Sequence, residues 1–221
     1  MCSHYQTLKD AELLLKKFGA PNKPAGGKYD MWPRYPGVFI RRPVEHDAGD
    51  EAVQEREAVV GRWGLISAVA KADDLDKAGN LSTFNARSET AAKSFTFGNA
   101  WRRAQHRIIP ADAIFEPDWR SGAAVATRFT RADGAPLGIA GLWDSFRDTA
   151  GQLQESYTML TIIADQDPLF RDYHQAGKEK RMVVILPEGA YGDWLTAPAD
   201  ATRDFLVPFP ADRLVATPME K

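Results

Sequence analysis

The sequence predicts one α+β domain built on a mainly antiparallel sheet or barrel with flanking helices. A length of 221 residues is enough for one sizeable core and short for two. The second half of the chain carries a series of short runs rich in β-branched and aromatic residues, which is typical of strands. Because we find no repeat, low-complexity tract or linker, we expect residues 1–221 to form a single domain.

The first half of the chain predicts one helix and two strands. Thr7-Leu8-Lys9-Asp10 has the spacing of a capping box, and apolar residues then recur at helical intervals as far as Phe18, before Gly19 and Pro21 end the helix. The composition of the following stretch, residues 21–36, predicts a loop. We expect strands at Val38–Arg41 and Val59–Ile66 and exposed segments at His46–Glu57 and Lys71–Asn80.

The second half predicts one longer helix followed by strands. Residues 91–105 favour a helix that turns Phe95, Phe97 and Trp101 inward. Asp133-Gly134 is a hairpin signal between two strand candidates. A short helix is expected at Pro187–Leu195. The predicted strands are Arg107–Ile109, Ala113–Phe115, Val125–Thr130, Leu137–Phe146, Tyr157–Ile163, Arg181–Leu186 and Arg213–Thr217.

Composition and charge exclude several classes of protein. A net charge of −2 gives no global basic field, so any contact with nucleic acid must use a local patch. A single cysteine excludes an internal disulfide framework and a cysteine zinc cluster, and the four histidines show no ligand spacing, so we expect no metal and no cofactor. Without a signal sequence or a spanning apolar run, we expect a cytoplasmic protein with no membrane contact.

The only cysteine, Cys2, stands directly behind Met1. Removing Met1 would leave an α-amine and a thiol on adjacent carbons. An α-amine has a pKa of about 7.7–8.0 and is therefore partly neutral at physiological pH, so it can attack an aldehyde to form a Schiff base. The neighbouring thiol can then close a thiazolidine ring. The alternative is that Cys2 is a small buried apolar residue, and position alone leaves both interpretations open.

Three further residue groups are candidates for chemistry. Asn85 and Arg87 pair an amide with a guanidinium that suits a phosphate, although, taken alone, Arg87 is more simply interpreted as a surface charge. Glu116 ends an apolar stretch, so partial burial would raise its pKa and suit it for proton transfer, unless it is simply solvated. His174 precedes a charged run and titrates in a useful range, although a lone histidine is often incidental.

Basic residues also lie near aromatic ones at two places. Arg102 and Arg103 follow Trp101, and a second basic group contains Arg34, Arg41 and Arg42. Such groups can bind a phosphate backbone and stack bases. Salt bridges between neighbouring strands explain these basic residues equally well.

Taken in order, these signals resemble the SOS-response-associated peptidase (SRAP) family. The resemblance runs along most of the chain. It rests on Cys2, Asn85-Ala86-Arg87-x-Glu89-Thr90, Phe115-Glu116 after Ile109-Pro110, and His174 ahead of Arg181-Met182-Val183-Val184-Ile185-Leu186, with Trp63-Gly64-Leu65-Ile66, the 138–143 segment and the 161–165 segment between them.

The resemblance implies a barrel-like core and a covalent activity. Family members shield abasic sites in single-stranded DNA by crosslinking the open-chain sugar to the N-terminal cysteine as a thiazolidine, and the family name reflects a proposed peptidase activity, at least removal of the leading methionine. Carried over, Cys2 is the nucleophile, Asn85 orients the amine or sugar, Glu116 moves protons and His174 assists ring opening. Arg87 would hold phosphate. The further candidates for contact with DNA are Trp63, His4, Arg102 and Arg103.

The sequence departs from the family pattern at several positions. Cys2-Ser3-His4-Tyr5 stands where Cys-Gly-Arg-Phe is common, so His4 replaces an arginine expected near DNA. Ser67-Ala68-Val69-Ala70 replaces the usual proline and tryptophan, Asp30-Met31-Trp32-Pro33 stands where Asn-x-x-Pro is usual, and the loop after His174 is longer. These changes bear on DNA affinity and leave the crosslinking residues intact.

Two other functions fit the residues. One is a cysteine N-terminal-nucleophile hydrolase acting on amide bonds, and the other is a non-catalytic single-stranded-DNA-binding protein. We expect a monomer whose partner is single-stranded DNA containing abasic sites.

Overall fold

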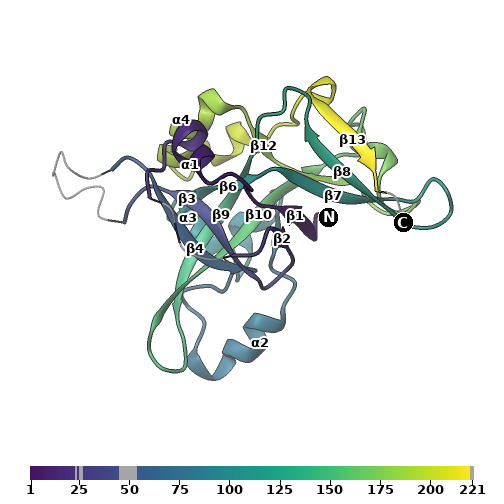
Figure 1. The fold of residues 1–221 in the computed structure, drawn as a ribbon. Coiled ribbons are helices and arrows are strands. Elements are labelled where there is room, and N and C mark those ends of the chain that lie inside the picture. The colour runs from purple at the N-terminus through teal and green to yellow at the C-terminus, as the bar shows by residue number, and fades with distance from the viewer. Residues whose placement is uncertain (23, 25–26, 45–53, 220–221) are drawn as a thin grey trace.

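A closed five-stranded barrel forms the centre of the molecule (Figure 1). The computed structural model describes residues 1–22, 24, 27–44 and 54–219. Around the barrel the order is β4-β3-β6-β9-β10, and β10 closes the ring by pairing in parallel with β4, while the other neighbours are antiparallel. These strands are β3 (Pro36–Arg41), β4 (Glu57–Trp63), β6 (His106–Ala111), β9 (Leu137–Arg147) and β10 (Leu153–Ile163). The expected α+β class and barrel-like core are confirmed.

A second, antiparallel sheet carries the N-terminus. Its order is β13-β8-β7-β1-β2, which places the first strand of the chain between β7 and β2. The bounds are β1 (His4–Gln6), β2 (Asp30–Met31), β7 (Ala113–Asp118), β8 (Val125–Arg131) and β13 (Leu214–Pro218). Three short strands extend the barrel sheet: β5 (Asn85–Arg87) and β11 (Arg181–Val183) pair with β10, and β12 (Ile185–Leu186) pairs with β9.

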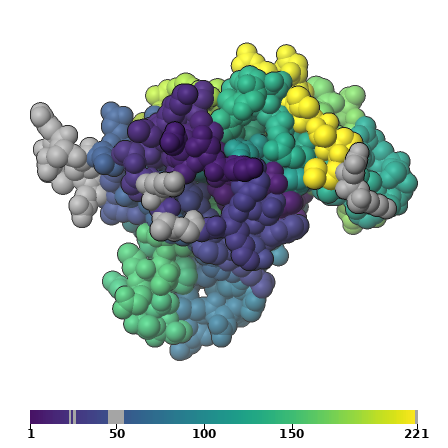
Figure 2. All heavy atoms as spheres, viewed as in Figure 1, coloured from purple at the N-terminus to yellow at the C-terminus, as the bar shows by residue number. Residues whose placement is uncertain are grey.

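The helices are short and lie outside the barrel. The α-helices are α1 (Glu12–Phe18), α2 (Leu75–Asn80), α3 (Gly98–Arg102) and α4 (Tyr191–Thr196). The 3₁₀ turns are η1 (Ala72–Asp74), η2 (Ala91–Lys93), η3 (Phe170–Asp172), η4 (Glu188–Ala190), η5 (Ala201–Phe205) and η6 (Ala211–Arg213). Helix α2 and the tip of the β9–β10 hairpin project together from one end of the molecule (Figure 2). None of the helices in the described ranges is long and apolar enough to cross a membrane.

The barrel interior is aromatic and contains a buried arginine. Phe39, Trp63 and Tyr157 are fully buried there. The Arg107 guanidinium lies 3.9 Å from the Tyr157 ring centroid and donates to the Thr158 carbonyl at 2.7 Å. Arg107 is fully buried, and its Nε and Nη1 have no hydrogen-bond partner among the described residues, so the facing aromatic rings and this one hydrogen bond compensate its burial in the core.

The first helix starts later than predicted. It begins at Glu12, and Thr7 takes no part in its cap. The Asp10 carboxylate instead accepts the Glu12 N–H at 2.9 Å. Its predicted end is confirmed, because Gly19 adopts the left-handed conformation with φ 66°. The predicted loop 21–36 contains the short strand β2, which the Pro and Gly content concealed.

The helix predicted over residues 91–105 is wrong. The chain forms η2 and then, after a break, α3. Ser94 adopts an extended conformation, and its hydroxyl accepts the N–H groups of Thr96 and Phe97, which supplies those donors with a partner other than a helical carbonyl. Phe95 is therefore 83% exposed and does not point inward, whereas Trp101 is buried as expected.

The structure also differs from the predictions for two connecting segments, residues 71–80 and the turn at Asp133-Gly134. Residues 71–80 form η1 and α2 instead of an irregular loop. At Asp133-Gly134 the chain does turn, with Gly134 at φ 74°, but β8 and β9 belong to different sheets, so the hairpin is wrong. Of the predicted exposed segment 46–57, residues 46–53 lie outside the described residues, and Glu57 already belongs to β4.

Candidate active site

Pairing of β1 with β7 fixes the position of the N-terminal residues. In β1, His4 lies opposite Phe115 of β7, so the residues before His4 lie beside Glu116. Strand β5 runs parallel to β10 and brings Asn85 to the same place, where its Nδ2 donates to the Cys2 carbonyl at 2.6 Å. Residues from positions 2, 85 and 116 therefore meet through pairing of three different strands.

Cys2 is fully buried, and its thiol is held by the backbone. The Sγ atom donates to the His4 carbonyl oxygen at 3.3 Å. Burial, with the Glu116 carboxylate as the second cause, raises the pKa of the Cys2 thiol well above its ordinary value. The sulfur is consequently a protonated thiol at neutral pH and needs a base to become a nucleophile.

Glu116 and His174 form a coupled pair around the terminal amine. His174 Nε2 lies 3.1 Å from Glu116 Oε2, and the Met1 amine lies 3.2 Å from the ring nitrogens of His174 and 3.6 Å from Glu116 Oε2. Burial raises the pKa of Glu116 to about 7, although the nearby amine opposes this. Burial and the same amine lower the pKa of His174 to about 4. A carboxyl group that titrates near neutrality beside a neutral imidazole is suited to proton transfer.

The backbone around His174 is fixed in an unusual conformation. Its φ is 65°, in the left-handed region that a histidine rarely adopts. The His174 N–H donates to the Pro117 carbonyl at 2.8 Å, and Lys180 Nζ donates to the His174 carbonyl at 2.9 Å. These bonds attach the loop to β7 and hold the imidazole over Glu116.

Three polar atoms of the site are buried without a hydrogen-bond partner among the described residues. They are Asn85 Oδ1 and both carboxylate oxygens of Glu116, although Oε2 makes the ion-pair contacts with the Met1 amine and His174. Buried oxygens usually find a donor, because an unpaired one costs free energy. Unpaired acceptors beside a nucleophile suit a ligand that brings hydroxyl or amine donors, such as an open-chain sugar.

Arg87 lies at the edge of this cluster within a network of charges. Its side chain is 51% exposed, and its Nη1 lies 3.3 Å from Glu179 Oε1. The same Glu179 oxygen lies 2.9 Å from Nη1 of the buried Arg181, whose Nη2 contacts Glu89 at 2.9 Å. Arg87 is thus the exposed cation of the network, and Glu179 occupies part of its hydrogen-bonding capacity.

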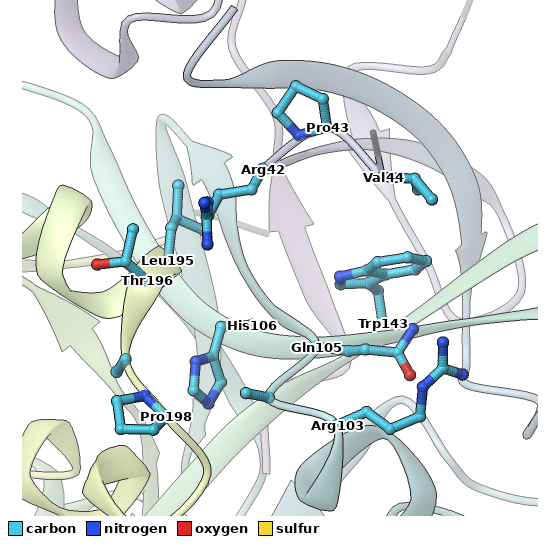
Figure 3. A pocket seen from close by; sticks show the side chains of 12 residues that line it. Arg42, Pro43, Val44, Arg103, Gln105, His106, Trp143, Leu195, Thr196 and Pro198 are labelled. Atoms are coloured by element: carbon cyan, nitrogen blue, oxygen red, sulfur yellow. The ribbon is translucent and has the colours of Figure 1, made fainter. Parts of the chain in front are cut away.

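The other residues predicted to contact DNA are not brought together. Trp63 is fully buried, and its Nε1 donates to the Phe84 carbonyl at 3.0 Å. The prediction that Trp63 contacts DNA is therefore wrong, and the residue belongs to the core. Arg102 is exposed at the end of α3. Arg103 lines a cleft of about 310 Å³ opposite Arg42, with Trp143 and His106 between them (Figure 3). His4 alone stays beside Cys2.

The sequence did not single out two residues that the structure places beside the site. Glu179 was one charge in a run, and only its contacts with Arg87 and Arg181 distinguish it. Trp32 lies against His4 at 4.2 Å between ring centroids. The departure at Asp30-Met31-Trp32-Pro33 was a signal that could have directed attention to Trp32.

The sequence matches the family described as SOS response associated peptidase (SRAP) over residues 1–221. A crystal structure of a protein from Bordetella bronchiseptica is 65% identical, with a TM-score of 0.92 and 100% of each chain covered. No match was found among curated proteins.

Two more distant crystal structures share the fold. One, a protein from Bacteroides thetaiotaomicron, is 20% identical with a TM-score of 0.79, covering 99% of this chain and 92% of its own. The other, a phage-related protein from Bordetella bronchiseptica, is 17% identical with a TM-score of 0.68, covering 100% of this chain and 95% of its own. At such identities the likeness concerns the fold alone. Because the family match extends from the first residue to the last, this chain belongs to the SOS response associated peptidase (SRAP) family.

Proposed function

We propose that the protein captures abasic sites in single-stranded DNA as a covalent thiazolidine on Cys2 after Met1 is removed. The observation that carries this proposal is the meeting of Cys2, Asn85, Glu116 and His174 at the chain end. An aminothiol, a carboxyl group with a pKa of about 7 and a neutral imidazole are the groups that this condensation needs.

The anchoring of Cys2 supports the first requirement, that losing Met1 leaves the nucleophile in place. Asn85 holds the Cys2 carbonyl, the thiol binds the His4 carbonyl, and β1 begins two residues later. None of these contacts involves Met1. Removal of Met1 would therefore free the space beside Glu116 and His174 for an aldehyde without releasing Cys2.

The chemistry balances as a condensation. The Cys2 amine adds to the aldehyde carbon of the ring-opened sugar, and the resulting carbinolamine loses its hydroxyl group as water after receiving a proton from Glu116. The thiol then adds to the iminium carbon: the S–C bond forms, the thiol proton passes to the Glu116 carboxylate, and the C=N π electron pair returns to the nitrogen, which keeps its single hydrogen. The net products are a thiazolidine and one water. His174, next to Glu116, would return protons and assist ring opening of the sugar.

Arg87 would provide the phosphate contact. It is the exposed cation of the network beside Asn85, and a guanidinium binds phosphate oxygens through two parallel hydrogen bonds. Because the net charge of the chain is −2, the binding of DNA would depend on such local cations. We expect the protein to act as a monomer in the cytoplasm.

A second candidate function is hydrolysis of a peptide bond by the same cluster, at least the bond between Met1 and Cys2. The contacts of the Met1 amine with His174 and Glu116 favour it, since the site holds a peptide N-terminus. This activity would unmask Cys2 and would precede DNA capture.

A denaturing gel separates these functions. Incubation with an oligonucleotide containing one abasic site should give a shifted band that survives denaturation, and an oligonucleotide with an intact base should not. Cys2→Ala should abolish the band, and Cys2→Ser should not restore a thiazolidine. A band that persists in Cys2→Ala would contradict the proposal. Salt-sensitive DNA binding without any covalent band would indicate a non-catalytic binding protein.

A further inference from the structure

Three aromatic rings are stacked beside the reacting residue. The His4 ring lies between Trp32, at 4.2 Å and 5° between planes, and Phe115, at 4.0 Å and 13°. They come from β1, from β7 and from the residue that follows β2, which are neighbours in one sheet. We call these three residues the aromatic stack.

The aromatic stack is held in place before any ligand arrives. His4 Nε2 lies 2.9 Å from Asp30 Oδ1, and Gln6 donates to the same oxygen at 3.1 Å. Phe115 is buried, His4 is half-buried, and Trp32 is 45% exposed at the outer end. Among the described residues, His4 is the one ring that stacks on Trp32. The stack therefore presents a fixed and accessible indole, and Trp32 is too exposed to serve the core alone.

The stack and the reacting centre share two strands. His4 is two residues from Cys2 and supplies the carbonyl that accepts the Cys2 thiol, while Phe115 directly precedes Glu116. A DNA strand whose sugar reaches Cys2 must therefore pass close to the stack.

The charge beside the stack favours a base over the DNA backbone as its ligand. The Asp30 side chain is 53% exposed and bonded to His4, and its carboxylate would repel a phosphate. An indole face accepts any base, because every base has a π face. An abasic sugar also leaves a neighbouring base without its stacking partner, so that base has a free face.

We propose that the aromatic stack is a nucleobase platform, on which Trp32 receives the base next to the abasic sugar. This inference depends on the proposed capture of abasic DNA. The platform would give contact with single-stranded DNA without sequence preference.

A protein–DNA mutant cycle tests the platform. Affinity is measured by fluorescence anisotropy in the Cys2→Ala background, so that no covalent product forms. The oligonucleotides carry a stable tetrahydrofuran abasic analogue, with both neighbours intact or with the 5′ or the 3′ neighbour replaced by a second analogue. Trp32→Ala should weaken binding about tenfold when both bases are present, within the range of base–aromatic stacking. Trp32→Ala should have almost no effect on the binding of one of the two oligonucleotides with a missing neighbour, namely the one that lacks the base stacked on Trp32. Trp32→Phe should retain most of the affinity, because it keeps an aromatic face.

The failures of the two proposals are distinguishable. If Trp32→Ala weakens binding equally on all three oligonucleotides, or on none, the platform is wrong, while covalent capture by the wild-type protein is unaffected. If the wild-type protein forms no denaturation-resistant product with a true abasic site, the proposed function is wrong, whatever the cycle shows. Thermal melting of Trp32→Ala and Trp32→Phe checks that both variants are folded.

Discussion

At the scale of single residues, burial changes the acidity of two groups at the N-terminal site. Burial raises the pKa of both Cys2 and Glu116, but with different consequences. The thiol remains protonated and unreactive, whereas Glu116, with a pKa of about 7, can both give and take a proton at physiological pH. In the proposed condensation the amine would therefore react first and the thiol second.

Replacing Glu116 should slow crosslink formation without lowering the affinity for DNA. We expect Glu116→Gln to reduce the rate of crosslink formation by about 100-fold, since general acid–base catalysis contributes roughly 10²–10⁴-fold. Affinity for the tetrahydrofuran oligonucleotide should stay within about twofold, because the amide has the same shape. Quenched-flow sampling on denaturing gels measures the rate. A wild-type rate in the variant would remove Glu116 from the mechanism.

The same residue should make stability depend on pH. The pKa of Glu116 is about 7 in the folded chain against an ordinary 4.5, so the folded state binds the proton more tightly. Its contribution is fully present below pH 4.5 and is lost as the pH rises through about 7. The loss is at most roughly 3 kcal/mol, at 1.36 kcal/mol per unit. Urea unfolding of the wild type and Glu116→Gln from pH 4.5 to 8 should show the wild type losing stability relative to the variant. Parallel curves would contradict the pKa assignment.

At the scale of elements, the loop between His174 and β11 holds the imidazole and carries Glu179, which would compete with DNA for the proposed phosphate contact at Arg87. Glu179, in this loop, pairs with Arg87 at 3.3 Å, so a DNA phosphate must displace a carboxylate to reach that guanidinium. This loop would thus carry an internal competitor for DNA.

Removing that competitor should strengthen binding. We expect Glu179→Gln to raise the affinity for single-stranded DNA several-fold, because the exposed Arg87 gains a free donor pair. Arg87→Ala should weaken binding and lower the salt slope by about 1. Glu188→Gln, which removes a carboxylate paired with Lys17 and Arg131 elsewhere, serves as the matched control. Unchanged affinity and salt slope in Arg87→Ala would show that Arg87 does not hold phosphate.

Local sequence signals predicted the strands better than the helices. β-Branched runs located β3, β4 and β6 to β10, because these strands bury one or both faces. The helix over residues 91–105 failed because Ser94 bonds the following N–H groups, which apolar spacing does not reveal. The hairpin at Asp133-Gly134 failed because a turn signal does not determine which sheet the next strand joins.

The sequence predicted which residues form the candidate site, but it did not predict the contacts among them and their neighbours. Cys2, Asn85, Glu116 and His174 do meet, and order along the chain together with a family resemblance identified them. The residues that contact this site come from distant parts of the chain. The sequence therefore could not predict that Glu179 would form an ion pair with Arg87 or that Trp32 would stack on His4. Trp63 was misassigned because an aromatic residue in a strand has the same local pattern in the core as on a binding surface.

At the scale of the whole molecule, the second sheet holds the N-terminus beside the barrel, and the proposed chemistry requires that the Cys2 amine be free. Sheet pairing from β1 onward does not depend on Met1. Extra residues placed before Met1 should therefore leave thermal unfolding unchanged and abolish crosslinking, because Cys2 would lack its amine. Differential scanning calorimetry and the denaturing gel measure the two effects. Crosslinking by the extended chain would contradict the requirement for an amine.

Intact-mass spectrometry of the wild-type protein after incubation with an abasic oligonucleotide shows whether Cys2 captures an abasic sugar once Met1 is removed. We expect a free protein lacking Met1 and an adduct whose mass equals that protein plus the oligonucleotide minus one water, with the modification on Cys2. A protein that retains Met1, an adduct that also forms in Cys2→Ala, or no adduct at all would contradict it.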